Sequence, residues 1–111
     1  MDVRSIKGLA EIRIGRDEKN TIVLDDLLIS RTHAVIRKEN GQCWIEDIHS
    51  QNGVRVNGRE IEKSQLLYEH DVVRIGNTIL ILWADTIIYN IFTKEEGQLS
   101  VNIRKNGGEF R

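Results

Sequence analysis

The sequence of 111 residues contains no proline, a single cysteine and only 5% aromatic residues, and it lacks a long apolar run. The one thiol, Cys43, excludes an internal disulfide framework and a zinc site built from cysteines. Because no apolar stretch approaches about 18 residues, the sequence predicts no membrane-spanning helix and no direct membrane insertion. The absence of proline argues against a polyproline recognition tail.

An excess of charge of one sign is also missing. The 16 Lys and Arg residues nearly balance the 17 Asp and Glu residues, so the formal net charge is −1. A chain this neutral has no broad attraction for polyanions, and we expect no nucleic-acid partner, although a local basic pocket is compatible with this balance. The segment after Met1 lacks the apolar stretch of a signal peptide, so we expect a cytoplasmic location.

Short β-branched runs alternate with turn signals along the chain. Alanine occurs only three times, whereas Ile, Val and Thr are plentiful, which favours strands over helices. Asn40-Gly41 and Gly76-Asn77 are typical of tight hairpin turns. Turns that recur about every eight to twelve residues predict an all-β sandwich or barrel. Strands are predicted at 11–14, 21–24, 33–38, 43–48, 54–56, 71–75 and 78–83, with a last hairpin at 86–92 and 99–104.

Polar residues gather in three turn segments beside the predicted strands. These segments are Gly15-Arg16, residues 30–33, and residues 50–53 followed by Asn57-Gly58. Loops at one end of a β-sandwich can converge on one ligand. Two arginines and a serine that meet there would form an anion pocket, because guanidinium groups bind phosphate bidentately and a hydroxyl adds a short hydrogen bond.

These motifs, in this order, resemble the forkhead-associated (FHA) domain family. The resemblance extends from about residue 14 to residue 83 and rests on Ile14-Gly15-Arg16, Ser30-Arg31-Thr32-His33-Ala34, Ser50-Gln51-Asn52-Gly53-Val54-Arg55-Val56-Asn57-Gly58 and Asp71-Val72-Val73-Arg74-Ile75-Gly76. It implies a β-sandwich of two twisted, mainly antiparallel sheets with its function in loops at one end. It also implies a module that binds phosphothreonine peptides in signalling or assembly, as part of a larger protein.

The resemblance assigns a role to each matching residue. Arg16 would contact or support the phosphate, Ser30 would donate its hydroxyl, and Arg31 would be a direct phosphate ligand. Asn52 would hold the peptide main chain, and Leu28 lies in the loop that helps to select the residue three places after the phosphothreonine. The implied phosphopeptide-binding set is Arg16, Ser30, Arg31, Gln51 and Asn52. The implied loop-shaping set is Gly15, His33, Gly53, Asn57 and Gly58.

Two departures from the family pattern support an alternative interpretation. Gln51 and Val54 stand where the family often has Thr or Ser, and the segment 27–29 is unusually apolar for a loop. The alternative is a degenerate structural module of a larger machine, for example a bacterial secretion system, that binds partners without phosphate. The sequence lacks a Gly-x-Ser-x-Gly nucleophile elbow, which argues against a hydrolase triad built from Ser30, His33 and a nearby Asp. We expect no enzyme, no cofactor and no metal site.

We expect residues 1–84 to form the phosphopeptide-binding domain. Residues 85–111 would form a C-terminal β-hairpin extension, either within the same sandwich or as a fragment of a following module. An exposed edge strand would permit a homodimer. Trp44 and Trp83 are predicted to lie in the core, and Cys43 is predicted to be a small buried hydrophobe. Asp25 and Asp26 are not expected to form an acid/base pair.

Overall fold

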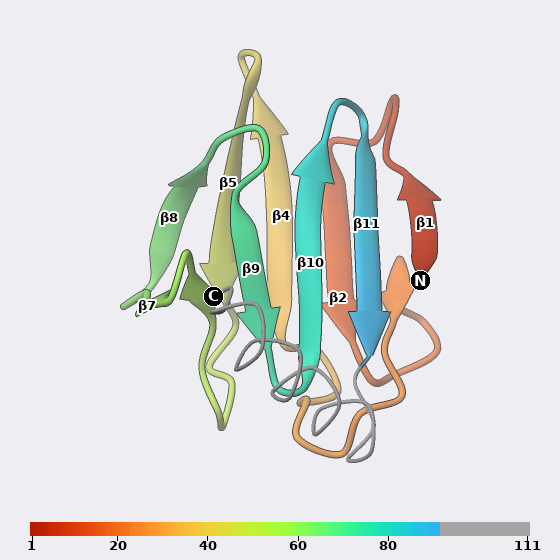
Figure 1. The fold of residues 1–111 in the computed structure, drawn as a ribbon, viewed down its shortest axis with the longest axis vertical. Coiled ribbons are helices and arrows are strands. Elements are labelled where there is room, and N and C mark those ends of the chain that lie inside the picture. The colour runs from red at the N-terminus through yellow and green to blue at the C-terminus, as the bar shows by residue number, and fades with distance from the viewer. Residues whose placement is uncertain (92–111) are drawn as a thin grey trace, which may run out of the picture.

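The structure is a computed structural model that describes residues 1–91, and strands are the regular secondary structure of this part of the chain (Figure 1). One sheet contains six strands: β1 (Asp2–Ser5), β6 (Arg55–Val56), β7 (Arg59–Glu60), β9 (Val72–Ile75), β10 (Thr78–Trp83) and β11 (Thr86–Ile91). The other sheet contains five strands: β2 (Glu11–Gly15), β3 (Ile22–Val23), β4 (Ala34–Glu39), β5 (Gln42–Asp47) and β8 (Ser64–Leu67). No segment of residues 1–91 forms a helix long and apolar enough to cross a membrane.

The two sheets pack face to face as a sandwich around one hydrophobic core (Figure 1). The six-stranded sheet has the order β1-β11-β10-β9-β6-β7, and the five-stranded sheet has the order β3-β2-β4-β5-β8. Within the described residues every pairing is antiparallel except that of β2 with β3. The predicted β-sandwich of mainly antiparallel sheets is therefore confirmed.

The core lies between the sheets because alternate side chains of each strand point inward. In β2, Ile12 and Ile14 are fully buried, whereas Glu11 and Arg13 are exposed. In β10, Leu80 and Leu82 alternate in the same way with less buried neighbours. One continuous cluster of Ile, Leu and Val side chains from both sheets fills the interior.

The predicted hairpin turns are also confirmed. Asn40 and Gly41 join β4 to β5 with φ values of 52° and 76°, and Glu39 pairs directly with Gln42. Two positive φ values at the centre of a two-residue turn match the twist of antiparallel strands, and Asn-Gly adopts them at little cost. Residues 76–77 likewise join β9 to β10, whose register begins at Ile75 and Thr78.

Several predictions differ from the structure. The strands β7 and β8 were not predicted, and the predicted core positions of Trp44 and Trp83 are wrong because these side chains are 38% and 54% exposed. Strand β11 covers most of the first half of the predicted last hairpin and lies in the six-stranded sheet between β1 and β10. The second half, 99–104, lies outside the described residues.

The turns of the sandwich fall into two groups at opposite ends. The loops 16–21, 24–33 and 48–54, together with the turn 76–77, lie at the lower end of Figure 1. The turns 40–41 and 84–85 lie at the upper end. The three motif-bearing loops therefore leave the sandwich at the same end.

Candidate functional site

The backbone brings Arg16 next to the segment that carries Ser30 and Arg31. The Arg16 N–H donates to the Ser30 carbonyl at 3.1 Å, and the Asp17 N–H donates to the Arg31 carbonyl at 3.1 Å. These two bonds align the end of β2 with the loop that precedes β4. The side chains of Arg16, Ser30 and Arg31 therefore start from adjacent stretches of backbone.

Gly15 permits this close approach. A Cβ atom on Gly15 would collide with the carbonyl oxygen of Arg31, so a larger residue would push the two segments apart. The same carbonyl accepts a hydrogen bond from the Asn20 side chain at 2.7 Å, and the Asn20 amide also donates to the Asp17 carbonyl at 2.8 Å. Asn20 is only 9% exposed, and the sequence around it does not indicate this role, because its partner lies 11 residues further along the chain.

His33 connects the loop of Ser30 to the loop of Gly53. Its side chain is fully buried, and the Ser30 N–H donates to its Nδ1 atom at 3.0 Å. Its Nε2 atom lies 2.8 Å from the Gly53 carbonyl oxygen. Because Nδ1 accepts a hydrogen bond, the ring proton resides on Nε2 and is donated to that carbonyl, which makes the imidazole neutral. His33 therefore holds two of the three loops together without contributing charge.

The polar side chains at this end retain hydrogen-bonding capacity for a ligand. The Ser30 Oγ atom accepts from the Gln51 N–H at 3.3 Å, which leaves its own hydroxyl hydrogen free to donate. Gln51 thus reaches Ser30 through its backbone. Arg16 and Arg31 are exposed, and neither guanidinium forms an ion pair with a carboxylate of residues 1–91.

Asn52 and Leu28 are in contact at the same end of the sandwich. The Asn52 amide donates to the Leu28 carbonyl at 2.8 Å. The second amide hydrogen and the side-chain oxygen of Asn52, which is an exposed residue, stay available. Leu28 is 47% exposed and its neighbour Leu27 is 85% exposed. An apolar surface therefore adjoins the polar groups.

Asn57 and Gly58 lie in a different part of the molecule. They form the turn between β6 and β7, with φ values of 52° and 84°. The Asn57 side chain accepts from the Val72 N–H at 3.0 Å and donates to Asp71 at 3.0 Å. Its contacts thus connect β6 with the start of β9, and none of them reaches the segments 16–17, 30–31 or 50–53.

Asp26 fixes the 24–33 loop to the opposite sheet. Its carboxylate is only 5% exposed, and its Oδ1 atom accepts from the Leu28 N–H at 3.0 Å. The Oδ2 atom accepts from the Asn77 N–H at 2.7 Å and from the Thr78 hydroxyl at 3.2 Å. The neighbouring Asp25 is exposed. Asp26 therefore joins a loop of the five-stranded sheet to a turn of the six-stranded sheet, a contact that the sequence did not reveal.

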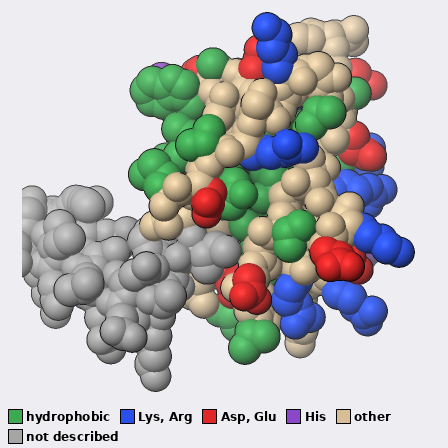
Figure 2. Space-filling view, turned by 90° about the vertical axis from the view of Figure 1, so that its right-hand side faces the viewer, with side chains coloured by type: hydrophobic (Ala, Val, Ile, Leu, Met, Phe, Trp, Pro, Cys, Tyr) green, Lys and Arg blue, Asp and Glu red, His purple; other side chains and the backbone are tan. Residues whose placement is uncertain are grey.

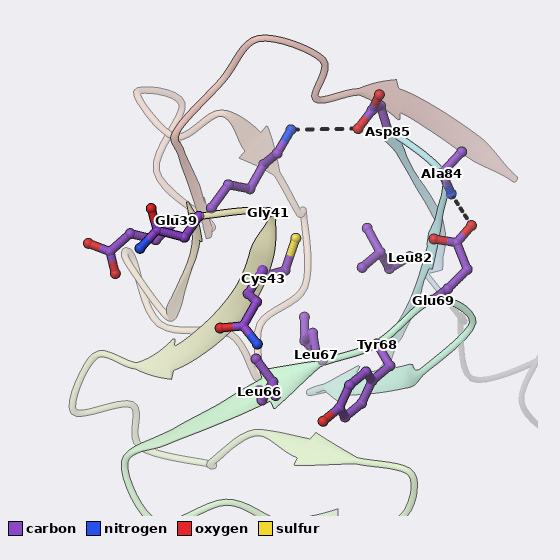
Figure 3. Close-up of a pocket in the computed structure, with 13 residues that line it drawn as sticks. Glu39, Gly41, Cys43, Leu66, Leu67, Tyr68, Glu69, Leu82, Ala84 and Asp85 are labelled. Carbon is purple, nitrogen blue, oxygen red and sulfur yellow. Dashed lines mark hydrogen bonds and ion pairs between the residues drawn. The ribbon is translucent and has the colours of Figure 1, made fainter.

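A hollow of about 550 Å³ opens at the other end of the sandwich (Figure 3). The Lys38 ammonium lies 3.7 Å from the Asp85 carboxylate at its edge, and Glu39 and Glu69 add further negative charge. Burial raises the pKa of the Cys43 thiol in this hollow. Excess negative charge makes this end a poor site for an anion. Residues 1–91 contain no group of three His, Cys, Asp or Glu placed to hold a metal ion.

Comparisons with known proteins agree with this geometry. The model of the FHA domain family matches residues 12–76. The chain is 41% identical over 76 residues to the ABC transporter ATP-binding/permease protein Rv1747 of Mycobacterium tuberculosis, which covers 68% of this chain and 9% of that protein. An NMR-based structure of the FHA-2 domain of that transporter has a TM-score of 0.66 at 38% identity, over 74% of this chain and 75% of that domain.

A second similar structure contains a ligand. It is Mycobacterium tuberculosis EmbR in complex with a low affinity phosphopeptide, with a TM-score of 0.59 at 35% identity, over 74% of this chain and 20% of that one. The chain spans less than half the length of the curated relatives Rv1747 and the oxoglutarate dehydrogenase inhibitors of Corynebacterium diphtheriae and Corynebacterium efficiens, at 9%, 46% and 49%.

Proposed function

The chain belongs to the FHA domain family, and we propose that it is a non-catalytic module that binds phosphothreonine in an extended peptide. One observation carries the proposal: the backbone bonds of Arg16 to Ser30 and of Asp17 to Arg31 place two guanidinium side chains and a hydroxyl on adjoining segments. The complex of EmbR with a phosphopeptide, seen in a relative that is 35% identical, supports the same class of ligand.

Three side chains would share the phosphate. A phosphothreonine carries about −1.5 to −2 charges and three strong acceptor oxygens. Arg31 would bind these oxygens directly, Arg16 would offset the remaining charge, and the Ser30 hydroxyl would donate through the hydrogen that its bond from Gln51 leaves free. Two arginines suffice for this charge, which agrees with a chain of net charge −1.

The rest of the peptide would lie across the polar edge of the same loops. The spare amide hydrogen and the oxygen of Asn52 would bind the peptide main chain after the phosphothreonine. The exposed side chains of Leu27 and Leu28 stand beside this position. We therefore expect a preference for an apolar residue a few positions after the phosphothreonine.

Calorimetry with three matched peptides tests the proposal. The peptides carry phosphothreonine, phosphoserine or unmodified threonine in one sequence, and only the phosphorylated peptides should bind, with threonine preferred. Arg31→Ala should weaken binding by about 2–5 kcal/mol, since it removes one partner of a charge pair. Arg59→Ala makes the same change on exposed β7 and should bind normally. Equal binding of all three peptides would refute the proposal.

The pH dependence of binding gives a second readout. The second pKa of a phosphate is about 6, so the phosphopeptide loses a negative charge as the pH falls through that value. Its affinity should therefore decline below about pH 6.

The alternative is a module that assembles a larger machine without phosphate. The 85% exposure of Leu27 is the observation that favours it, because such a side chain is suited to an apolar protein surface. A physiological partner that binds a Ser30→Ala, Arg31→Ala protein as tightly as the original would establish this alternative. The greater length of the curated relatives supports our proposal that the chain is part of a larger protein. We also propose a cytoplasmic location, where ATP-dependent kinases would supply the phosphothreonine.

A further inference from the structure

Strand β1 has one edge with which no other strand of residues 1–91 pairs. It is the outermost strand of the six-stranded sheet, and all four of its residues are exposed, with Val3 at 66%. An unpaired edge offers a row of backbone donors and acceptors to another strand. Of the four edge strands in residues 1–91, β3 and β7 contain two residues each, whereas β1 and β8 contain four. Strand β8 ends in the buried Leu67, so β1 is the four-residue edge strand whose residues are all exposed.

The backbone of β1 shows which groups face the free side. The Ile6 N–H donates to the Asp85 carbonyl at 2.8 Å, which continues the pairing of β1 with β11 by one residue. Successive residues of an antiparallel strand direct their backbone groups to opposite sides. The backbone groups of Asp2 and Arg4 therefore point toward β11, and those of Val3 point away from the sheet.

We propose that β1 pairs antiparallel with β1 of a second copy of this chain, centred on Val3. Val3 of each copy would exchange two backbone hydrogen bonds with Val3 of the other, because its N–H and C=O face the free side. In this register Asp2 of each copy lies opposite Arg4 of the other. Both residues are exposed, and opposite charges at facing positions stabilise an antiparallel pair.

The other symmetric registers within β1 lack this complementarity. Centring the pairing on Asp2 places two aspartates opposite each other, and centring it on Arg4 places two arginines opposite each other. Like charges at facing positions are destabilising. Centring it on Ser5 places Arg4 opposite the apolar Ile6. Only the register centred on Val3 satisfies both the charges and the backbone.

A row of apolar side chains on the outer face of the six-stranded sheet extends to β1. The registers place Val3 beside Ile88, Ile88 beside Ile81, and Ile81 beside Val72, so these residues form one apolar row across four strands. Val72 is 38% exposed, and the two isoleucines are half-buried. Figure 2 faces the β1 side of the molecule and shows hydrophobic side chains gathered along the upper left. Pairing through Val3 would extend the row into the second copy.

A contact of four residues per strand buries much less than the roughly 1,200 Å² of a stable interface, so the dimer should be weak and reversible. The two-fold axis of such a pair is perpendicular to the sheet. The ends of the two sandwiches that carry the loops 16–21, 24–33 and 48–54 would then point in opposite directions. Each copy could therefore hold a separate partner.

Sedimentation equilibrium of the full chain over a range of concentrations tests the proposal. Asp2→Arg and Arg4→Asp each place like charges at both facing positions and should weaken the dimer about tenfold. The double variant Asp2→Arg, Arg4→Asp restores opposite charges and should return the dimer constant to within about threefold of the original. Glu62→Arg makes the same charge change as Asp2→Arg at an exposed residue outside β1 and should dimerise normally.

Three results would overturn the proposal: a monomer at every concentration, single variants that dimerise like the original, or a double variant that does not recover. High salt should weaken the original dimer because it screens the exposed pairs. None of these substitutions lies in the segments 16–17, 30–31 or 50–53, so phosphopeptide binding can fail or succeed independently of this test.

Discussion

Replacing Asp26 by asparagine should detach the 24–33 loop from the opposite sheet. The change keeps the shape of the side chain but replaces one acceptor oxygen with an amide that can only donate. All three groups that face the carboxylate are donors: the Leu28 N–H, the Asn77 N–H and the Thr78 hydroxyl. The oxygen of an asparagine can therefore accept either from Leu28 or from Asn77 and Thr78, and its NH2 group then faces the backbone N–H on the other side.

The hydrogen bonds of Asp26 determine how much free energy of unfolding is lost. Whichever way the amide turns, at least one backbone N–H loses a bond to a charged acceptor, and such a bond contributes about 1.5–3 kcal/mol. The remaining bonds persist to a neutral oxygen and weaken. Because Asp26 is only 5% exposed, water cannot readily replace the lost partner. We expect Asp26→Asn to lower the free energy of unfolding by about 2–4 kcal/mol.

Urea denaturation followed by tryptophan fluorescence measures this loss, and calorimetry with a phosphothreonine peptide measures its effect on the loop. Asp25→Asn is the matched control, because it makes the same change one residue earlier at an exposed position and should stay within about 0.5 kcal/mol of the original. The peptide should also bind more weakly to Asp26→Asn, since Ser30 lies in the loop that is released. Equal unfolding free energies for the two variants would refute the reasoning.

Three further outcomes are expected. Gly15→Ala should abolish phosphopeptide binding and lower the melting temperature, because its Cβ would collide with the Arg31 carbonyl; a variant that melts and binds normally would contradict the contact. His33→Leu should lower the unfolding free energy by about 2–5 kcal/mol in denaturation, because it leaves two backbone groups without their partner. Cys43 should react with iodoacetamide more slowly at pH 8 than a free thiol and accelerate as the pH rises, because burial raises its pKa and keeps it protonated. A rate equal to that of a small thiol would show that the side chain is not shielded.

Local signals in the sequence account for the hairpins and the fold class. Asn40-Gly41 and Gly76-Asn77 predict turns because the required backbone conformation depends on those residues themselves. The alternation of Ile12 and Ile14 with exposed residues predicts a half-buried strand for the same reason. The order of the three polar segments then indicates the family, which the match to residues 12–76 confirms.

Features that depend on distant partners could not be predicted. The partners of Asp26 lie in a turn about fifty residues away, and nothing near Asp26 in the sequence indicates that its carboxylate is buried. Size and apolar character predict a core position for Trp44 and Trp83, but much of a folded surface is apolar. Each of these residues lies on the outward-facing side of its strand. The residues of the short strand β8 have little β-propensity, and the strand forms because it pairs with β5. This pairing depends on the fold, so the local sequence does not predict β8.

The two ends of the sandwich differ in how the molecule can be attached to a support. Ile91 pairs with Thr78, whose hydroxyl contacts Asp26, so a tag fused to Ile91 in place of residues 92–111 would begin beside the loops proposed to bind the peptide. The Asn40-Gly41 turn lies at the far end, where a tether leaves those loops open to solution. A biosensor that holds the protein by a tag fused to Ile91 and one that holds it by this turn should therefore report different capacities for the same peptide.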